Sequence, residues 1–213
     1  MNNTSTLFHG SLRAALAVLI GALSCLTMAA PAGTPVATGT AMRSALPSDS
    51  IYQLPVALTD QNGNTFRLDT LRGQPMLISM FFTSCQFVCP MLTDALRDTA
   101  NKLQPADRER LKVVMVTFDP ARDSVAVLKR TAIAHSLTDA QWTLARTDEA
   151  STRKLAAVLN IQYKPLADGD FNHTTALILI DSEGRMVGRS PQLGGADPAF
   201  VKLVQAAVQR APR

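Results

Sequence analysis

The feature that most constrains the fold is a pair of cysteines placed where a buried strand gives way to a helix. Residues 75–82 (PMLISMFF) form an almost continuous apolar run, typical of a strand buried on both faces of a sheet. Cys85 and Cys89 follow this run, and Pro90 suits the first turn of a helix because its missing N–H costs nothing there. Leucines at helical spacing predict that this helix continues to about residue 103. The pair is therefore expected beyond the carboxyl end of a central strand.

The alternation of strand and helix continues to the C-terminus. It begins with a hairpin, since Asn62-Gly63 is a strong turn signal between two short strands. Alternating strands and helices favour a mixed sheet covered by helices on both faces. Together with the strand–CxxxC–helix opening, the pattern predicts an α/β, thioredoxin-like fold with an N-terminal β-hairpin. The expected strands are 56–59, 65–68, 75–82, 112–118, 142–145, 176–180 and 186–189, and the expected helices are 90–103, 124–135, 148–159 and 197–209.

The N-terminus has the pattern of an export signal. Residues 14–30 are apolar or small, and small residues flank Pro31, which suits cleavage near Ala32. We therefore predict a signal peptide over 1–32, a flexible linker over 33–50 and one thioredoxin-like domain over 51–213, in a periplasmic protein. An uncleaved membrane anchor is the alternative for the first segment, although its apolar run is short for a span of about 20 residues.

The charge and the cysteine count exclude two kinds of function. The net charge is +4, but the Lys and Arg residues are scattered and form no basic patch, so we expect no nucleic-acid partner. The chain has three cysteines, and cleavage near Ala32 removes Cys25 and leaves Cys85 and Cys89. A disulfide across so short a loop adds little stability. The pair therefore indicates chemistry rather than a structural staple.

The spacing of the pair decides which chemistry is open to it. A helix N-terminus favours thiolate over thiol. Side chains four positions apart in a helix face the same way, with Cβ atoms about 5–6 Å apart, so Cys85 and Cys89 are able to converge on a metal ion. A disulfide needs a closer approach, to about 3.8 Å, and remains possible after a small adjustment.

A third candidate ligand is His173, in a polar loop (residues 168–175) that leads into the strand at 176–180. In a thioredoxin-like fold this loop faces the helix that carries the cysteines, but a simple surface histidine is an equally good interpretation. His135 is expected at the surface, at the end of a helix. Two thiolates and one imidazole suit copper, whereas structural zinc usually takes four protein ligands. Met80 and Met91 lie near the motif and are expected to be core residues.

The chain resembles the Sco/SenC family of copper-binding proteins, which assist assembly of cytochrome c oxidase. The resemblance extends from about residue 54 to residue 203. It rests on FFTSCQFVCP (81–90), on TFDPARDSVAVL (117–128), and on Asn172-His173-Thr174 followed by an apolar strand and Asp181-Ser182-Glu183-Gly184. It implies that Cys85, Cys89 and His173 are the ligands of one copper ion, as Cu(I) or Cu(II). It places Asp119 near the site without binding the metal, although Asp119 is equally suited to capping its own turn.

Two functions follow from these expectations. The first is a copper metallochaperone that delivers copper to, or prepares, the binuclear copper site of a cytochrome c oxidase subunit. The alternative is a thiol–disulfide oxidoreductase in which Cys85 and Cys89 are the catalytic residues and reduce the cysteine pair of a copper-site partner. A periplasmic thioredoxin-like reductant is an expected partner in both cases, because copper needs the reduced dithiol. Other copper chaperones are further candidate partners.

Overall fold

The computed structural model describes residues 45–85 and 88–212. Within these ranges the chain forms a seven-stranded sheet, a separate two-stranded hairpin and helices on both faces of the larger sheet. The elements are β1 (Ala57–Asp60), β2 (Thr65–Arg67), β3 (Met76–Phe81), α1 (Val88–Asn101), α2 (Pro105–Glu109), β4 (Lys112–Thr117), α3 (Val125–Ala134), β5 (Trp142–Arg146), α4 (Glu149–Val158), β6 (Tyr163–Pro165), β7 (Phe171–His173), β8 (Leu177–Ile180), β9 (Met186–Ser190) and α5 (Pro198–Arg210), with short 3-10 helices at Ile51–Gln53 and Leu68–Leu71.

The large sheet has the order β2-β1-β5-β4-β3-β8-β9. Strands β3, β4 and β5 are parallel neighbours, whereas β8 and β1 pair antiparallel on either side of them. All six residues of β3 are buried, as expected of a central strand covered on both faces. Because β3, β4 and β5 are parallel, the loops that follow them meet at one edge of the sheet.

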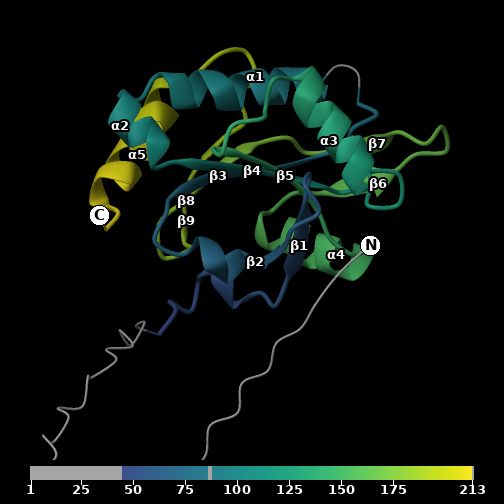
Figure 1. Cartoon of the computed structure of the whole chain (residues 1–213), viewed down its shortest axis with the longest axis horizontal. Helices are drawn as coiled ribbons and strands as arrows, with labels where there is room; N and C mark the ends of the chain where they lie inside the picture. Colours follow the sequence, from purple (N-terminus) through teal and green to yellow (C-terminus); the bar gives the residue numbers. More distant parts are fainter. Residues whose placement is uncertain (1–44, 86–87, 213) are drawn as a thin grey trace, which may run out of the picture. The chain divides into compact units, whose positions relative to one another are not determined.

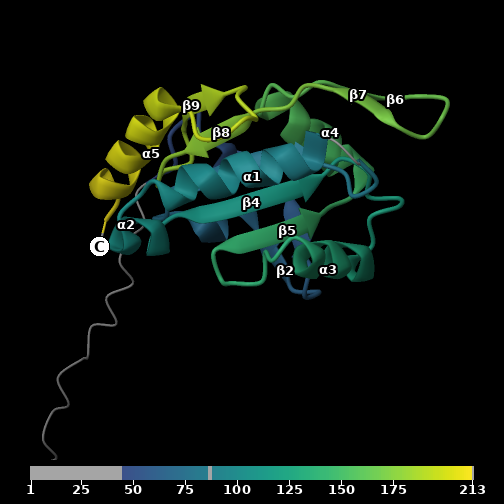
Figure 2. The same cartoon turned by 90° about the horizontal axis from the view of Figure 1, so that it is seen from above.

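The helices form a layer on each face of the sheet. Figures 1 and 2 show α1, α3 and α5 over one face and α4 beneath the other. The connections β3–α1–β4 and β4–α3–β5 run in the same direction across the sheet, so right-handed crossovers place their helices on the same face. The chain then turns back through α4, which lies on the opposite face. This arrangement confirms the predicted mixed sheet with an N-terminal hairpin.

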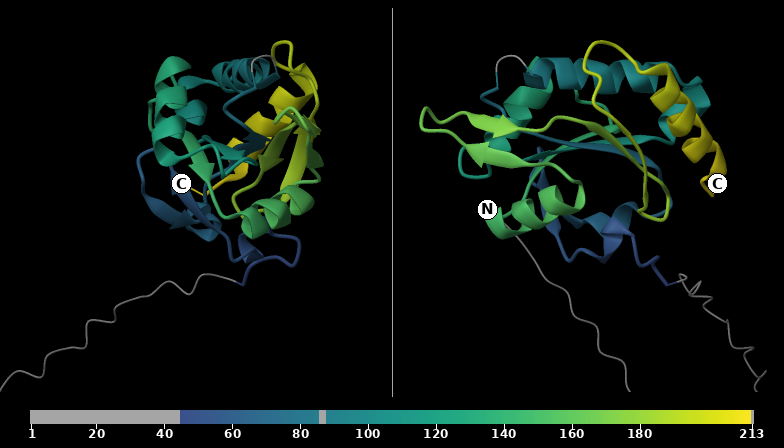
Figure 3. Two further views of the ribbon diagram at one scale, coloured as in Figure 1. Left: turned by 90° about the vertical axis from the view of Figure 1, so that its right-hand side faces the viewer. Right: turned by 180° about the vertical axis from the view of Figure 1, so that it is seen from behind.

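One element departs from the expected pattern. The polar loop predicted over residues 168–175 is in part a strand, β7, which pairs antiparallel with β6 to form a two-stranded hairpin. The hairpin projects from the body of the domain, as Figures 1 and 3 show. Each of its strands has only three residues, too few to show the alternation of polar and apolar residues by which a half-buried strand is predicted.

The N-terminal part of the described chain already belongs to the domain. Leu46 packs against the core, and the Ser50 hydroxyl donates a hydrogen bond to the Glu183 carbonyl oxygen at 2.6 Å. The predicted signal peptide (1–32) and the first part of the predicted linker lie outside the described residues. Within 45–85 and 88–212, no helix is long and apolar enough to cross a membrane.

Candidate metal centre

The two cysteines lie beyond the carboxyl end of β3, as predicted, and are bound to one backbone carbonyl. The Cys85 N–H donates to the Phe82 oxygen at 3.4 Å, and the Cys89 Sγ donates to the same oxygen at 3.3 Å. Cys89 is in the first turn of α1, with Pro90 directly after it. Both cysteines are free thiols. The shared carbonyl holds the two residues close to each other without a disulfide.

The two thiols differ in their surroundings. Cys85 is half-buried, whereas Cys89 is only 8% exposed. Burial raises the pKa of the Cys89 thiol, and the neighbouring Cys85 adds to the increase. The expectation that the helix N-terminus favours thiolate therefore does not hold for Cys89, because the cost of burying a charge is the larger effect. A soft cation supplies the missing positive charge and displaces the proton.

A buried carboxylate fixes the loop that carries Cys85. Asp123 is fully buried and accepts a hydrogen bond from the Thr83 N–H at 3.1 Å and from the hydroxyl groups of Thr83 and Thr117. Thr83 lies two residues before Cys85, and Thr117 ends β4. Asp123 therefore joins the carboxyl ends of β3 and β4. Sequence reasoning missed this role, although an Asp four residues after Asp119 was visible in the motif.

His173 lies at the end of β7 and faces a cluster of rings. It pairs with Tyr163 across the hairpin. Its ring centroid is 4.9 Å from that of Phe118 and 5.8 Å from that of Phe82. The Thr175 Oγ1 lies 3.1 Å from His173 Nδ1 and restricts rotation of the ring.

The ring cluster joins the two halves of the candidate site. It combines Phe82 from the cysteine loop, Phe118 from the end of β4 and three rings of the hairpin. The centroid distances are 5.2 Å for Phe82–Phe118, 5.1 Å for Phe82–Phe171, 5.0 Å for Phe118–Phe171 and 5.2 Å for Phe118–Tyr163. Phe82 is thus the residue common to both halves, since its carbonyl binds the cysteines and its ring contacts His173.

The three predicted ligands are linked through Phe82 but do not form a closed site. Within the described ranges, no three His, Cys, Asp or Glu side chains are grouped as a metal ion requires. The donor set still fits copper chemically, because two thiols and an imidazole are the soft and intermediate donors that copper prefers. The assignment of Cys85, Cys89 and His173 as ligands therefore stays a prediction, and closing the site requires a shift of the hairpin or of the cysteine loop.

Asp119 closes its own turn, which is one of the two roles considered for it, and a role beside a bound metal stays a prediction. Its backbone oxygen accepts from the N–H groups of Arg122 at 3.3 Å and Asp123 at 3.0 Å, so it closes its own turn. Its carboxylate, only 7% exposed, forms an ion pair with Arg122. The side chain is thus engaged with a guanidinium beside the ring cluster.

Two residues near the cysteines differ from expectation. His135 is half-buried, and it lines a small cavity of about 20 Å³ together with Cys85 and Cys89, so it is not a plain surface residue. A cavity of this size has room for one water molecule. Met80 is buried as predicted, whereas Met91 is 48% exposed on α1, so its assignment to the core was wrong.

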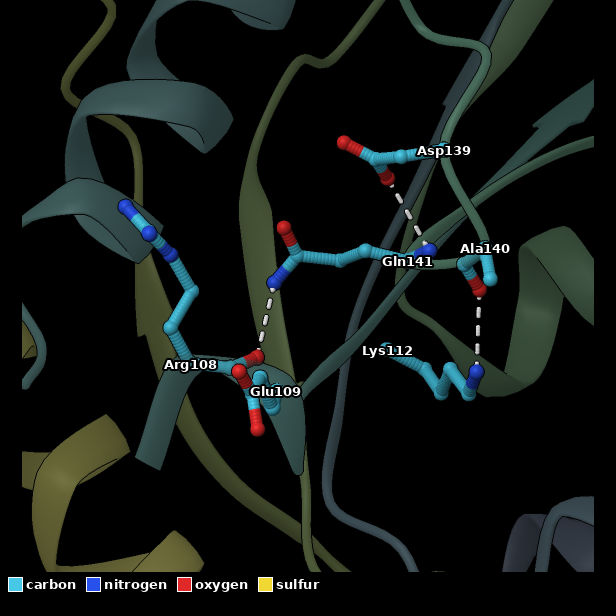
Figure 4. A pocket seen from close by; sticks show the side chains of 6 residues that line it. All are labelled: Arg108, Glu109, Lys112, Asp139, Ala140 and Gln141. Atoms are coloured by element: carbon cyan, nitrogen blue, oxygen red, sulfur yellow. Dashed lines mark hydrogen bonds between the residues drawn. The ribbon is translucent and has the colours of Figure 1, made fainter. Parts of the chain in front are cut away.

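A larger hollow of about 260 Å³ lies at the opposite edge of the sheet, at the amino ends of β4 and β5. Figure 4 shows that the side chains of Gln141, Lys112 and Asp139 bond to neighbouring backbone groups. Gln141 Nε2 donates to the Arg108 oxygen at 3.1 Å, Lys112 Nζ donates to the Ala140 oxygen at 2.9 Å, and Asp139 Oδ1 accepts from the Gln141 N–H at 3.0 Å. Its lining includes no cysteine or histidine. The cysteine edge is therefore the stronger candidate for the functional site.

The fold and the dithiol define a thioredoxin-like protein with a cysteine pair at the end of its central strand. The chain belongs to the SCO1/SenC family, whose model matches residues 45–208. This confirms the resemblance drawn from the motifs. Within the family, Cys85, Cys89 and His173 remain the residues on which a metal-binding hypothesis depends.

Individual relatives give the same picture. A Stutzerimonas stutzeri protein named for copper binding is 29% identical over 135 residues, which cover 62% of this chain and 65%, just under two thirds, of that protein. Among solved structures, Bradyrhizobium japonicum ScoI with copper bound is 28% identical, with a TM-score of 0.57, and the match covers 75% of this chain and 98% of that one. Yeast Sco1 with copper bound is 25% identical, with a TM-score of 0.62, over 75% of this chain and 89% of that one.

Proposed function

We propose that this chain is a periplasmic copper metallochaperone. It carries one copper ion on Cys85, Cys89 and His173 and delivers it to the binuclear copper site of a cytochrome c oxidase subunit. Membership of the SCO1/SenC family and the copper-bound structures of two relatives support the metal. The observation that carries the proposal is local: the Cys85 N–H and the Cys89 thiol both donate to the Phe82 carbonyl oxygen, and the His173 ring packs on the same residue.

Copper is the cargo of this reaction, and the chain provides donors that are exchanged one at a time. An incoming thiolate of the acceptor replaces one donor while the remaining donors still hold the ion. His173 is the donor that leaves first, since it lies on the projecting hairpin and the thiolates bind Cu(I) more strongly. Cys85 follows, because it is more exposed than Cys89.

Copper stoichiometry tests the proposal. We expect the reduced chain to bind one copper ion and the chain oxidised to a Cys85–Cys89 disulfide to bind none, because a disulfide leaves no thiolate to coordinate. Elemental analysis after desalting measures both forms, with Cys85→Ser and Cys89→Ser as further samples. Equal copper in the reduced and oxidised forms would exclude the dithiol as the binding site.

A second candidate function is thiol–disulfide exchange, favoured by the unequal exposure of the two thiols. In this reaction the Cys85 thiolate attacks a disulfide of the partner, forms a mixed disulfide and releases one partner thiolate. The Cys89 sulfur then loses its proton and attacks Cys85 Sγ, which releases the second partner thiolate and leaves a Cys85–Cys89 disulfide. Two electrons pass to the partner, and a periplasmic thioredoxin-like dithiol restores the reduced chain.

His173 discriminates between the two functions. Metal delivery needs its imidazole, whereas dithiol exchange requires no proton transfer from it. We expect His173→Ala to abolish oxidase assembly in cells and to leave the rate of exchange with a small disulfide nearly unchanged. A variant that supports the oxidase normally would give the reductase function first place.

Export is part of the proposal and has its own test. Cleavage near Ala32 is expected to leave a periplasmic chain without Cys25, which mass spectrometry of the isolated protein detects. An intact N-terminus recovered with the membrane fraction would identify the segment as an anchor instead.

A further inference from the structure

Two consecutive side chains, Arg122 and Asp123, reach the two halves of the candidate site. Asp123 binds Thr83 and so holds the loop that leads to Cys85. Arg122 extends the other way, to the hairpin that carries His173, where its Cζ lies 5.5 Å from the centroid of the Phe171 ring. The segment 119–123 thus lies between the cysteine loop and the histidine hairpin and contacts both.

The Arg122 guanidinium is itself held in place. Its Nε donates to the Asp119 carboxylate, which is nearly buried, and the Asp119 N–H donates to Thr117 Oγ1 at 2.9 Å. The hairpin loop passes close to the same side chain, because a Cβ built at Gly169 would lie 3.2 Å from Arg122 Nη1. Arg122 therefore lies between a fixed anion on the β4 side and both the ring and the loop of the hairpin.

The hairpin depends on such contacts because its own pairing is small. Strands β6 and β7 share three residue pairs and belong to no larger sheet. A two-stranded hairpin is marginally stable in water by itself. Its position is thus set by the rings packed on Phe82 and Phe118 and by the cation over Phe171. A cation over an aromatic face is attracted by the ring quadrupole and favours one position of that ring.

We propose that Arg122 is a positioning residue that holds the β6–β7 hairpin, and with it His173, over the cysteine loop. This inference rests on the proposed copper function, since it concerns the third donor of that site. Arg122 acts through Phe171 and Asp119 and does not bind the ion. Its removal leaves the two thiols in place and widens the range of positions that His173 occupies.

Hydrogen exchange of the reduced, metal-free chain tests the proposal directly. The reporters are the Thr174 N–H, bonded to the Gln162 oxygen at 2.9 Å, and the Leu166 N–H, bonded to the Asp170 oxygen at 2.8 Å. We expect Arg122→Gln to speed exchange of these two amides about twofold to fivefold, the size of effect that a cation–ring contact supports when the cation side chain is 45% exposed. The Phe118 N–H, bonded to the Phe81 oxygen in the sheet, is the internal reference and is expected to keep its rate.

The matched control is Arg153→Gln. Arg153 lines the same groove as Phe171, but it forms an exposed ion pair with Glu149 on α4, with its side chain 62% exposed. We expect this variant to leave the hairpin amides unchanged. Arg122→Lys keeps the positive charge but lacks the planar guanidinium group. We expect the hairpin amides of this variant to exchange more slowly than those of Arg122→Gln and faster than those of the wild-type chain.

Copper binding supplies the second readout. In Arg122→Gln we expect Cu(II) affinity to fall about threefold to tenfold, with weaker nitrogen coupling in the electron paramagnetic resonance spectrum, while Cu(I) affinity is kept. Unchanged hairpin exchange in Arg122→Gln, or an equal increase in Arg153→Gln, overturns the positioning role. If the wild-type chain binds no copper, the proposed function fails, and the exchange rates still decide whether Arg122 holds the hairpin.

Discussion

The cysteines and the histidine of the proposed site lie on parts of the molecule that are held in different ways. Cys85 and Cys89 follow a fully buried central strand and are bound to one carbonyl, in a loop fixed by a buried carboxylate. His173 lies on a two-stranded hairpin outside the main sheet. The first pair is part of the core, whereas the third donor is held by ring contacts and by Arg122.

This difference suits the proposed copper carrier, which would have to both bind and release the ion. The hairpin binds copper only in the position that brings His173 to the ion. If the hairpin also occupies other positions, the apparent affinity of the three-donor site is the intrinsic affinity multiplied by the fraction of molecules in the binding position. In that case Cys85 and Cys89 hold the copper ion, and the hairpin supplies a third donor, His173, that easily dissociates from it. The predictions below test whether the two halves respond separately to mutation.

The largest effect is expected at Phe82, because it belongs to both halves. Phe82→Ala removes a side chain that is 1% exposed and leaves a cavity beneath the cysteine loop. We expect a loss of about 3–5 kcal/mol in the free energy of unfolding, measured by urea denaturation of the reduced chain. Both halves are expected to loosen, with faster exchange at the hairpin amides and a higher reactivity of Cys89.

Phe171→Ala is the matched control for that prediction. Phe171 belongs to the same ring cluster but is only half-buried on the hairpin. We expect a loss of about 1–2 kcal/mol, with the change in exchange confined to the hairpin. Equal losses from the two variants would contradict the distinction between a core half and a peripheral half.

The second prediction concerns the cysteine half alone. Asp123→Asn removes the charge of the buried carboxylate and one of the two acceptor oxygens that bind the Thr83 N–H and the hydroxyl groups of Thr83 and Thr117. We expect a loss of about 1–3 kcal/mol in stability and a weaker hold on the Cys85 loop. Urea denaturation and the rate of Cys89 alkylation measure these effects, while the hairpin amides are expected to keep their rates.

Thr83→Val provides a milder variant of the same test. It removes the hydroxyl bond to Asp123 and keeps the backbone bond. We expect a loss of about 1 kcal/mol, in the same direction as Asp123→Asn. Asp69→Asn, which alters an exposed ion pair with Arg67, is the control expected to be close to neutral. A hairpin that loosens together with the cysteine loop would show that the two halves are coupled.

The sequence predicted the framework and the position of the cysteine half. The apolar runs at residues 75–82 and 112–118 predict buried strands, and Pro90 predicts the start of a helix. These predictions succeed because each signal lies within the segment that it describes. The sequence did not predict β6 and β7, since strands of three residues are too short to show a period of alternating polar and apolar residues. It also left Asp123 and Arg122 without roles, because their partners Thr83 and Phe171 are distant in the chain and meet only in the folded structure.

The third prediction compares the two histidines that remain in the described chain. His173→Ala removes a donor from the hairpin, and His135→Ala removes an imidazole from the cavity beside the cysteines. Cu(II) prefers nitrogen donors, whereas Cu(I) persists with two thiolates. We expect His173→Ala to weaken Cu(II) binding by about tenfold or more and Cu(I) binding much less, while His135→Ala changes neither. Titrations with both oxidation states measure this, and the reverse result would identify His135 as the third donor.

The smallest expected effect is on stability at acid pH. It concerns the carboxylates that cap two helices, α5 beside the cysteine half and α4 before the histidine hairpin. Asp197 caps α5, which packs against the cysteine helix α1, and Asp148 caps α4, which precedes the hairpin. The Ser190 hydroxyl and the Phe200 N–H lower the pKa of Asp197, whereas the Ser151 hydroxyl and N–H lower that of Asp148. The bond from Ser190 comes from β9, at 2.9 Å, so protonation of Asp197 also weakens a tertiary contact.

The direction of the pH effect follows from these lowered pKa values. The folded chain binds both protons more weakly than the unfolded chain, so the stabilisation is complete above the ordinary carboxyl pKa of 3.8 and is lost as the pH falls through the lowered values. We expect Asp197→Asn to remove more of the acid sensitivity below about pH 4 than Asp148→Asn does. Urea midpoints across that range measure it. A larger change in Asp148→Asn would mean that local caps outweigh the tertiary contact, and that the helix before the hairpin is held no less firmly than the one packed on α1.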